Sequence, residues 1–195
     1  MIVYLGMPKC ASTWLYDKIQ HNFEYDGIKE PHTLVEYGKT NNNYIDFSTN
    51  NWSMDSKTAL ELDSKVSKYI YIIRDPIELA TSYYLQTAKN ENFNDYVDSL
   101  IKTKLLCFGD IIERWYNLVD KNKILVYNYN NDIQNNQQSF LDKITTILNI
   151  DYDKSVPPQI KVFVTKDKPI LTCNNNLKEK LNYQLNKFKE ITEKL

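Results

Sequence analysis

The sequence predicts a single α/β domain with a central parallel sheet of about four or five strands flanked by helices. Short runs of β-branched and aromatic residues, typical of buried strands, occupy residues 2–5, 69–73 and 123–129. Helical spacing follows each run, and strands that alternate with helices form parallel sheets with right-handed crossovers. The chain has 195 residues, of which 42% are hydrophobic, and no linker divides residues 1–195.

The first half of the chain shows this alternation twice. After the strand at 2–5, the spacing of apolar residues predicts a helix over residues 12 to about 22. Residues 32–56 are aromatic and polar, and they predict a loop with short ordered pieces. A helix over 58–66 then leads into the strand at 69–73.

The second half begins with a clear helix start. Pro76 at the first helical position and Asp75 as its N-cap predict a helix that runs to about Lys89. Helical spacing recurs in four later segments, residues 93–104, 108–119, 137–150 and 174–194. The proline-containing residues 151–172 predict irregular structure.

Composition excludes several classes of function. The net charge is −1, so the chain lacks the overall positive charge that attracts nucleic acid. Three cysteines without a CxxC pair predict neither a metal site nor a disulfide framework. No apolar stretch is long enough to span a membrane, and no basic segment precedes the first apolar run. We therefore expect a cytoplasmic protein with neither a membrane span nor a nucleic-acid partner.

The stretch GMPKCASTW lies between the first predicted strand and the first predicted helix. Such a connection presents backbone N–H groups and the positive end of the helix dipole, which together bind phosphate or sulfate. In the P-loop of nucleotide kinases a lysine follows the turn and directly precedes the hydroxyl residue. Here Lys9 comes early, and Cys10 and Ala11 separate it from Ser12. This order disfavours an enzyme that uses ATP or GTP.

The same stretch resembles the 5′-phosphosulfate loop of sulfotransferases that use 3′-phosphoadenosine 5′-phosphosulfate (PAPS), with the pattern P-K-x-[GA]-[ST]-T-[WST]-L. The resemblance implies a P-loop-like architecture. It also implies that Lys9 contacts the bridging oxygen and the sulfuryl group, while the following residues hold the 5′-phosphate. The implied cofactor-binding residues in this loop are Pro8, Lys9, Cys10, Ala11, Ser12, Thr13 and Trp14.

A second stretch, RDPIELATSYY, resembles the 3′-phosphate element of the same family, R-x-P-x-x-R-x-x-S-x-Y. The resemblance implies that Arg74, Ser82 and Tyr84 bind the nucleotide. An arginine at a strand end offers a planar fork to a phosphate. The middle arginine of the family pattern is Leu79 in this chain.

The stretch IKEPHTL resembles the KE-x-H segment of glycan sulfotransferases of the heparan sulfate type, which lies beside the acceptor of the sulfuryl group. The resemblance implies that Glu30 is the base and that His32 lies beside the acceptor; His32 is the alternative base. Substrate contacts are expected from Lys29, Trp52 and Lys57. Lys166 and Lys168 are expected to close over the 3′-phosphate and adenine.

The resemblance therefore implies transfer of a sulfuryl group from PAPS to a hydroxyl or amine acceptor, with a glycan as the expected acceptor. The product would be adenosine 3′,5′-bisphosphate (PAP), and no metal is expected. Two alternatives stay open at the level of sequence. One is a nucleotide kinase of the P-loop type, and the other is a non-catalytic module that binds a nucleotide or a glycan.

Overall fold

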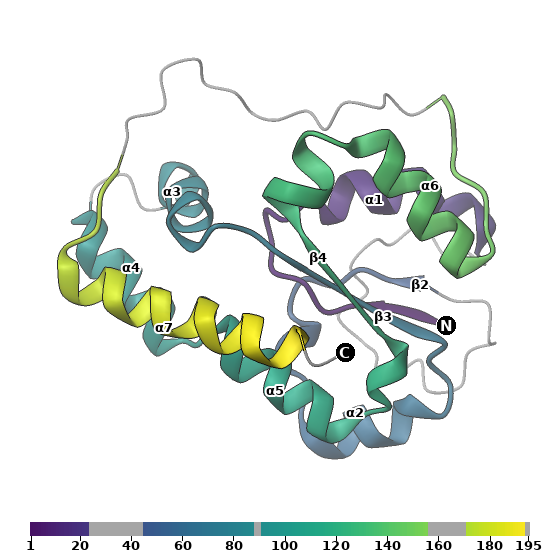
Figure 1. Ribbon diagram of the computed structural model, residues 1–195, viewed down its shortest axis with the longest axis horizontal. Coiled ribbons are helices and arrows are strands. Elements are labelled where there is room, and N and C mark those ends of the chain that lie inside the picture. Colours follow the sequence, from purple (N-terminus) through teal and green to yellow (C-terminus); the bar gives the residue numbers. More distant parts are fainter. Residues whose placement is uncertain (24–44, 88–90, 156–170, 194–195) are drawn as a thin grey trace. The chain divides into compact units, whose positions relative to one another are not determined.

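The computed structural model (Figure 1) describes residues 1–23, 45–87, 91–155 and 171–193. The chain divides into two compact units. The sheet unit comprises Met1–Ile73 and Leu118–Phe163, and the helical unit comprises Arg74–Asn117 and Val164–Leu195. The single domain predicted over residues 1–195 stays a prediction.

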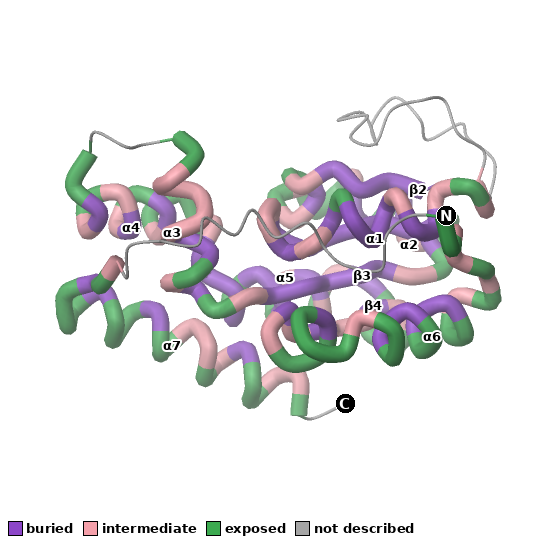
Figure 2. The backbone as a smooth tube through the Cα atoms, turned by 90° about the horizontal axis from the view of Figure 1, so that it is seen from above, coloured by how far each residue is buried: buried purple, intermediate pink, exposed green. Residues whose placement is uncertain are grey.

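The sheet unit contains a four-stranded sheet in which every pairing is parallel and the strand order is β2-β1-β3-β4. Its strands are β1 (Ile2–Tyr4), β2 (Ile45–Asp46), β3 (Lys68–Ile73) and β4 (Ile124–Asn128). Figure 2 shows that β3 is buried along most of its length, as expected for the YIYII run at the centre of a sheet. The parallel sheet confirms the predicted fold class.

Helices cover both faces of this sheet. Figure 1 shows α1 and α6 on one face and α2 on the other. The aromatic ring of Phe140 in α6 lies 6.2 Å from Trp14 of α1 and 4.9 Å from Tyr127 of β4. The helical elements of the unit are α1 (Ser12–Ile19), η1 (Gln20–Asn22), η2 (Asn51–Ser53), α2 (Ser56–Asp63), η3 (Lys121–Lys123), the π-helix η4 (Tyr129–Gln134) and α6 (Gln137–Leu148).

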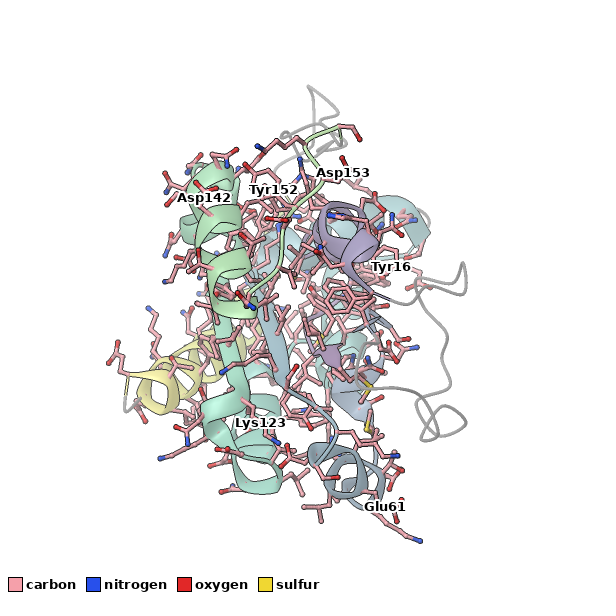
Figure 3. The ribbon with its side chains drawn as sticks, turned by 90° about the vertical axis from the view of Figure 1, so that its right-hand side faces the viewer. Tyr16, Glu61, Lys123, Asp142, Tyr152 and Asp153 are labelled. Carbon is pink, nitrogen blue, oxygen red and sulfur yellow. The ribbon has the colours of Figure 1, made fainter. Side chains whose placement is uncertain are left out.

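The segment after α6 returns to α1 and fastens the two helices together. The backbone N–H of Asp153 donates to the Lys18 carbonyl at 2.7 Å, and Lys18 Nζ donates back to the Asp153 carbonyl at 3.0 Å. The Tyr152 hydroxyl accepts a hydrogen bond from Gln138 of α6 at 2.7 Å. Figure 3 shows Tyr152 between the two helices. Burial of Lys18 lowers its pKa, because desolvation disfavours the charged form.

The helical unit contains α3 (Pro76–Thr87), α4 (Phe93–Lys102), α5 (Phe108–Leu118) and α7 (Asn175–Thr192). In Figure 1, α7 lies beside α4 and α5. Lys187 of α7 bridges Asp110 and Glu113 of α5, each at 2.7 Å. The helices approach so closely that a Cβ on Gly109 would lie 2.7 Å from Lys187 Cβ and 2.8 Å from the Gln184 carbonyl oxygen. Position 109 therefore requires a residue without a side chain.

Sequence patterns located most of these elements to within a few residues. The short helices η2 and η3 were not predicted, and neither were two further elements, β2 and η4. The strand β2 has only two residues and lies inside the segment predicted as loop. The π-helix η4 follows β4 directly; the Asn128 side chain accepts from the N–H groups of Asn130 and Asn131, and the Asp132 carboxylate accepts from the Asn128 N–H. These side-chain bonds compete with regular α-helical pairing.

Candidate active site

The carboxyl ends of β1 and β3 define one edge of the sheet, because the two strands are neighbours and parallel. Ligands of open parallel sheets bind at this edge. Residues 5–11 leave it to connect β1 with α1, and we call them the β1–α1 loop. The Leu5 N–H still donates to the Ile70 carbonyl at 2.8 Å, so the loop begins in contact with β3.

The backbone of the β1–α1 loop adopts an unusual conformation at two residues that are not glycine. Lys9 has φ 65° and Ala11 has φ 64°, both in the left-handed region. This conformation costs about 1–2 kcal/mol for a residue that carries a side chain. Alternating turns of this kind bring successive N–H groups to one side, as in anion-binding nests. Strain held at a helix N-terminus is typical of functional loops.

Ala11 is also the N-cap of α1, and its carbonyl accepts from the Leu15 N–H at 3.0 Å. An alanine has no side-chain oxygen, so it cannot cap the helix as serine or aspartate would. The positive end of the helix dipole therefore lies at the loop without a capping side chain from its own N-cap. This arrangement favours an anion at the start of α1.

Side chains of the loop differ in exposure. Thr13 is exposed and Lys9 is partly exposed. Cys10, Ser12 and Trp14 are buried, with at most 7% of each residue accessible. The side chains of these three residues are thus largely withdrawn from solvent, whereas that of Lys9 is partly exposed. Their roles in nucleotide binding stay predictions.

Two further residues shape the loop and were not found from sequence. Tyr4, the last residue of β1, is fully buried, and its hydroxyl lies 3.2 Å from the Met7 carbonyl oxygen and 3.3 Å from that of Cys10. A Cβ on Gly6 would overlap with the same hydroxyl. The only sequence signal was a tyrosine at the end of the strand followed by glycine two residues later.

The end of β2 adds a buried carboxylate near the same edge of the sheet. Asp46 is paired in register with Val3 of β1 and is fully buried. Its Oδ1 accepts from the Ser48 N–H at 2.7 Å and from Asn51 Nδ2 at 3.0 Å. Asp46 therefore fixes the turn that follows β2. This residue was not predicted as part of the site, because β2 was not predicted.

The expected substrate contacts of this region lie close to that turn in sequence. Trp52 belongs to η2, directly after Asn51, and is partly buried. Lys57 lies in the first turn of α2 with 86% of its side chain exposed, and its Nζ is 3.9 Å from Glu61. Their roles in substrate binding stay predictions.

The stretch predicted to bind the 3′-phosphate lies in the helical unit. Arg74 directly follows β3, and α3 starts at Pro76. Asp75 Oδ1 accepts from the N–H groups of Ile77 and Glu78, each at 2.9 Å, which confirms the expected helix cap. Nε and Nη2 of Arg74 both lie 3.2 Å from Glu78 Oε2, and only 13% of the arginine side chain is exposed.

Ser82 and Tyr84 lie further along α3. Ser82 is partly buried. The Tyr84 hydroxyl donates to the Glu91 carbonyl at 2.6 Å, and its ring packs edge-on against Phe93 at 5.3 Å and Tyr96 at 5.6 Å. Tyr84 thus links α3 to the start of α4, in addition to the nucleotide contact that sequence predicts for it.

Several expected site residues lie outside the described parts of the chain, namely Lys29, Glu30, His32, Lys166 and Lys168. Their roles stay predictions. Over the residues that the structure does describe, no group of three or more His, Cys, Asp or Glu side chains is placed to hold a metal ion. Within those same residues, no helix combines the length and apolar character needed to cross a membrane.

The family model of the sulfotransferase domain matches residues 1–192, nearly the whole chain. The chain belongs to the sulfotransferase family. The fold agrees with this assignment, since a crystal structure of a sulfotransferase from Alicyclobacillus acidocaldarius superimposes with a TM-score of 0.68 at 12% identity, covering 97% of this chain and 94% of that one.

A crystal structure of a mouse sulfotransferase complexed with PAP is also similar, with a TM-score of 0.47 and 18% identity over 79% of this chain and 60% of that one. No curated protein sequence matches this sulfotransferase significantly.

Proposed function

We propose that this sulfotransferase takes its sulfuryl group from PAPS and transfers it to a hydroxyl or amine acceptor, with a glycan as the preferred acceptor class. The observation that carries the proposal is the β1–α1 loop. Its two left-handed residues, Lys9 and Ala11, flank Cys10, and α1 begins directly after Ala11. This geometry favours an anionic group with a cation beside it.

The donor carries two separate anionic groups, and the chain has a sequence element for each. We assign the 5′-phosphosulfate to the β1–α1 loop and the 3′-phosphate to Arg74 and Ser82, following the two motifs. Arg74 and Ser82 are eight residues apart, so the serine lies two helical turns beyond the arginine. ATP has no 3′-phosphate and would leave the second element unused, which favours PAPS over a kinase donor.

In the proposed reaction an acceptor oxygen or nitrogen forms a bond to sulfur, and the bond between sulfur and the 5′-phosphate oxygen breaks. Lys9 stabilises the negative charge that develops on the leaving oxygen, through the same electrostatic effect that operates in phosphoryl transfer. Glu30, or alternatively His32, accepts the acceptor proton. PAP and the sulfated acceptor are the products.

The test is a transfer assay with PAPS radiolabelled in its sulfuryl group and a panel of glycans and small hydroxyl and amine compounds. We expect label in at least one acceptor together with an equal amount of PAP. Lys9→Ala should lower turnover by about a hundredfold or more while the protein stays folded. Lys121→Ala is the matched control, because it removes an exposed lysine from η3, outside the proposed site.

PAP binding without transfer to any acceptor would favour a non-catalytic module. Turnover that is unchanged in Lys9→Ala would remove Lys9 from the mechanism.

A further inference from the structure

The Tyr4 side chain lies inside the turn that carries Lys9. Its ring is fully buried and stacks on Phe47, with centroids 5.0 Å apart and planes 18° apart. Its hydroxyl is within hydrogen-bond distance of the Met7 and Cys10 carbonyls, which lie on either side of Lys9 in sequence. A phenol has one proton to donate, so it bonds one carbonyl at a time and can exchange between the two.

The loop is closed tightly around this ring. A side chain at position 6 would overlap with Tyr4, since a Cβ there would clash with both Cζ and the hydroxyl oxygen. The same Cβ would lie 3.0 Å from the backbone nitrogen of Ile72 in β3. Gly6 therefore lets the chain pass between the tyrosine and the neighbouring strand. Tyr4 and Gly6 together fix where the loop leaves the sheet.

We propose that Tyr4 is a positioning residue that holds the β1–α1 loop in its anion-binding conformation. The left-handed conformations at Lys9 and Ala11 are strained, and they persist only where surrounding contacts compensate for the strain. The Tyr4 hydroxyl supplies such a contact at the carbonyls on both sides of Lys9. The role assigned to the loop rests on the proposed function, in which the loop binds the 5′ end of the donor.

The test measures the affinities of the Tyr4→Phe and Tyr69→Phe variants for two ligands. These are PAP and adenosine 3′-monophosphate, which lacks the 5′-phosphate. Phenylalanine keeps the ring and removes only the hydroxyl. Tyr69 is the matched control because it is 2% exposed in the same sheet and its hydroxyl donates to Asp63 Oδ1 at 3.2 Å, near the start of β3. Each variant thus loses one hydroxyl hydrogen bond from a buried tyrosine.

We expect Tyr4→Phe to weaken PAP binding by about five- to tenfold, the loss of one buried hydrogen bond. Binding of the 3′-monophosphate should stay within about twofold, because that ligand has no group for the loop. Tyr69→Phe should leave both affinities unchanged, even if the variant has a lower melting temperature. A general loss of stability would weaken the binding of both ligands alike, and would not weaken that of PAP alone.

A second readout needs no ligand. Cys10 is fully buried in the loop, and Cys107 and Cys173 are free, buried thiols in the helical unit. Loosening of the loop in Tyr4→Phe should accelerate alkylation of Cys10 several-fold and leave the rates of the other two thiols unchanged. Equal acceleration of all three would show global unfolding and contradict a local role.

Two results would overturn the proposal while the proposed function stands. One is wild-type PAP affinity in Tyr4→Phe with unchanged Cys10 reactivity. The other is a Tyr4→Phe chain that fails to fold, since the hydroxyl would then support the whole fold and not the loop. A wild-type protein that does not bind PAP would instead reject the proposed function, and the role of Tyr4 with it.

Discussion

Arg74 and Glu78 form an ion pair across one turn at the start of α3, with two guanidinium nitrogens each 3.2 Å from Glu78 Oε2. The pair holds the arginine fork in one orientation directly after β3. A phosphate that binds Arg74 must share the guanidinium with this carboxylate or displace it. Glu78 therefore competes with the phosphate that we propose to bind at Arg74.

Replacing the arginine should weaken nucleotide binding. We expect Arg74→Ala to reduce the affinity for PAP by about 2 kcal/mol, because a charged hydrogen bond to phosphate is lost. Arg74→Lys should give an intermediate affinity, since an ammonium group lacks the planar fork. Calorimetric titration measures both. Arg114→Ala is a useful control in the same unit, and an equal loss there would argue against a specific role for Arg74.

Removing the carboxylate should have the opposite effect. Glu78→Gln keeps the shape of the side chain but removes a negative charge that competes with phosphate for Arg74. We expect PAP to bind up to about fivefold more tightly, the scale of a solvent-accessible ion pair, and the gain should shrink in high salt. Weaker binding in this variant would instead show that Glu78 acts mainly by orienting the arginine.

The strain at Ala11 predicts a stabilising substitution. Glycine adopts φ 64° without the steric penalty that alanine has there, although it also makes the unfolded chain more flexible. Ala11→Gly should raise the free energy of unfolding by about 0.5–1 kcal/mol. Urea denaturation measures this difference. A lower stability would mean that position 11 is not left-handed in solution.

The helical unit should lose stability in acid through Asp98. Hydrogen bonds from Lys102 and Lys180 lower the pKa of this carboxyl from its ordinary value of 3.8. A group whose pKa is lower in the folded state stabilises the fold above its unfolded pKa and loses this effect as the pH falls through its folded pKa. Asp98→Asn should melt earlier than the wild type at pH 7, and the difference should begin to shrink below about pH 4 and vanish only once the pH lies below the lowered pKa of the folded protein. A difference that persists in acid would exclude the ionised carboxylate as its source.

The base is predicted from sequence and is tested by a pair of variants. Glu30→Gln keeps shape and hydrogen bonding but cannot accept a proton, so it should abolish transfer and leave PAP binding within a few-fold of wild type. His32→Ala should retain partial activity. An active Glu30→Gln with an inactive His32→Ala would make histidine the base and would contradict the glycan-type assignment.

The parts of the fold that the sequence predicted correctly depend on local signals. The YIYII run is β-branched and aromatic enough to mark β3, and Asp75 with Pro76 marks the start of α3. The strand β2 was missed because two residues are too few to show a pattern, and its pairing with β1 exists only in the folded sheet. Short strands of this kind depend on tertiary contacts.

The motif residues of the candidate site could be predicted from the sequence. The residues that hold the surrounding loops in place could not. The order of Pro8, Lys9 and Ser12 and the spacing from Arg74 to Ser82 are visible in the sequence. The direction of the Tyr4 hydroxyl is not, because it depends on the loop folding back over the strand end. The same holds for Asp46, whose hydrogen bonds form only once the turn after β2 is in place.

The identity of the donor is tested by a calorimetric titration of the unmodified protein with PAP and, separately, with ATP and Mg²⁺. We expect micromolar binding of PAP, about −8 kcal/mol, and at least tenfold weaker binding of ATP with Mg²⁺. Absence of PAP binding, or tighter binding of ATP with Mg²⁺, would contradict this expectation.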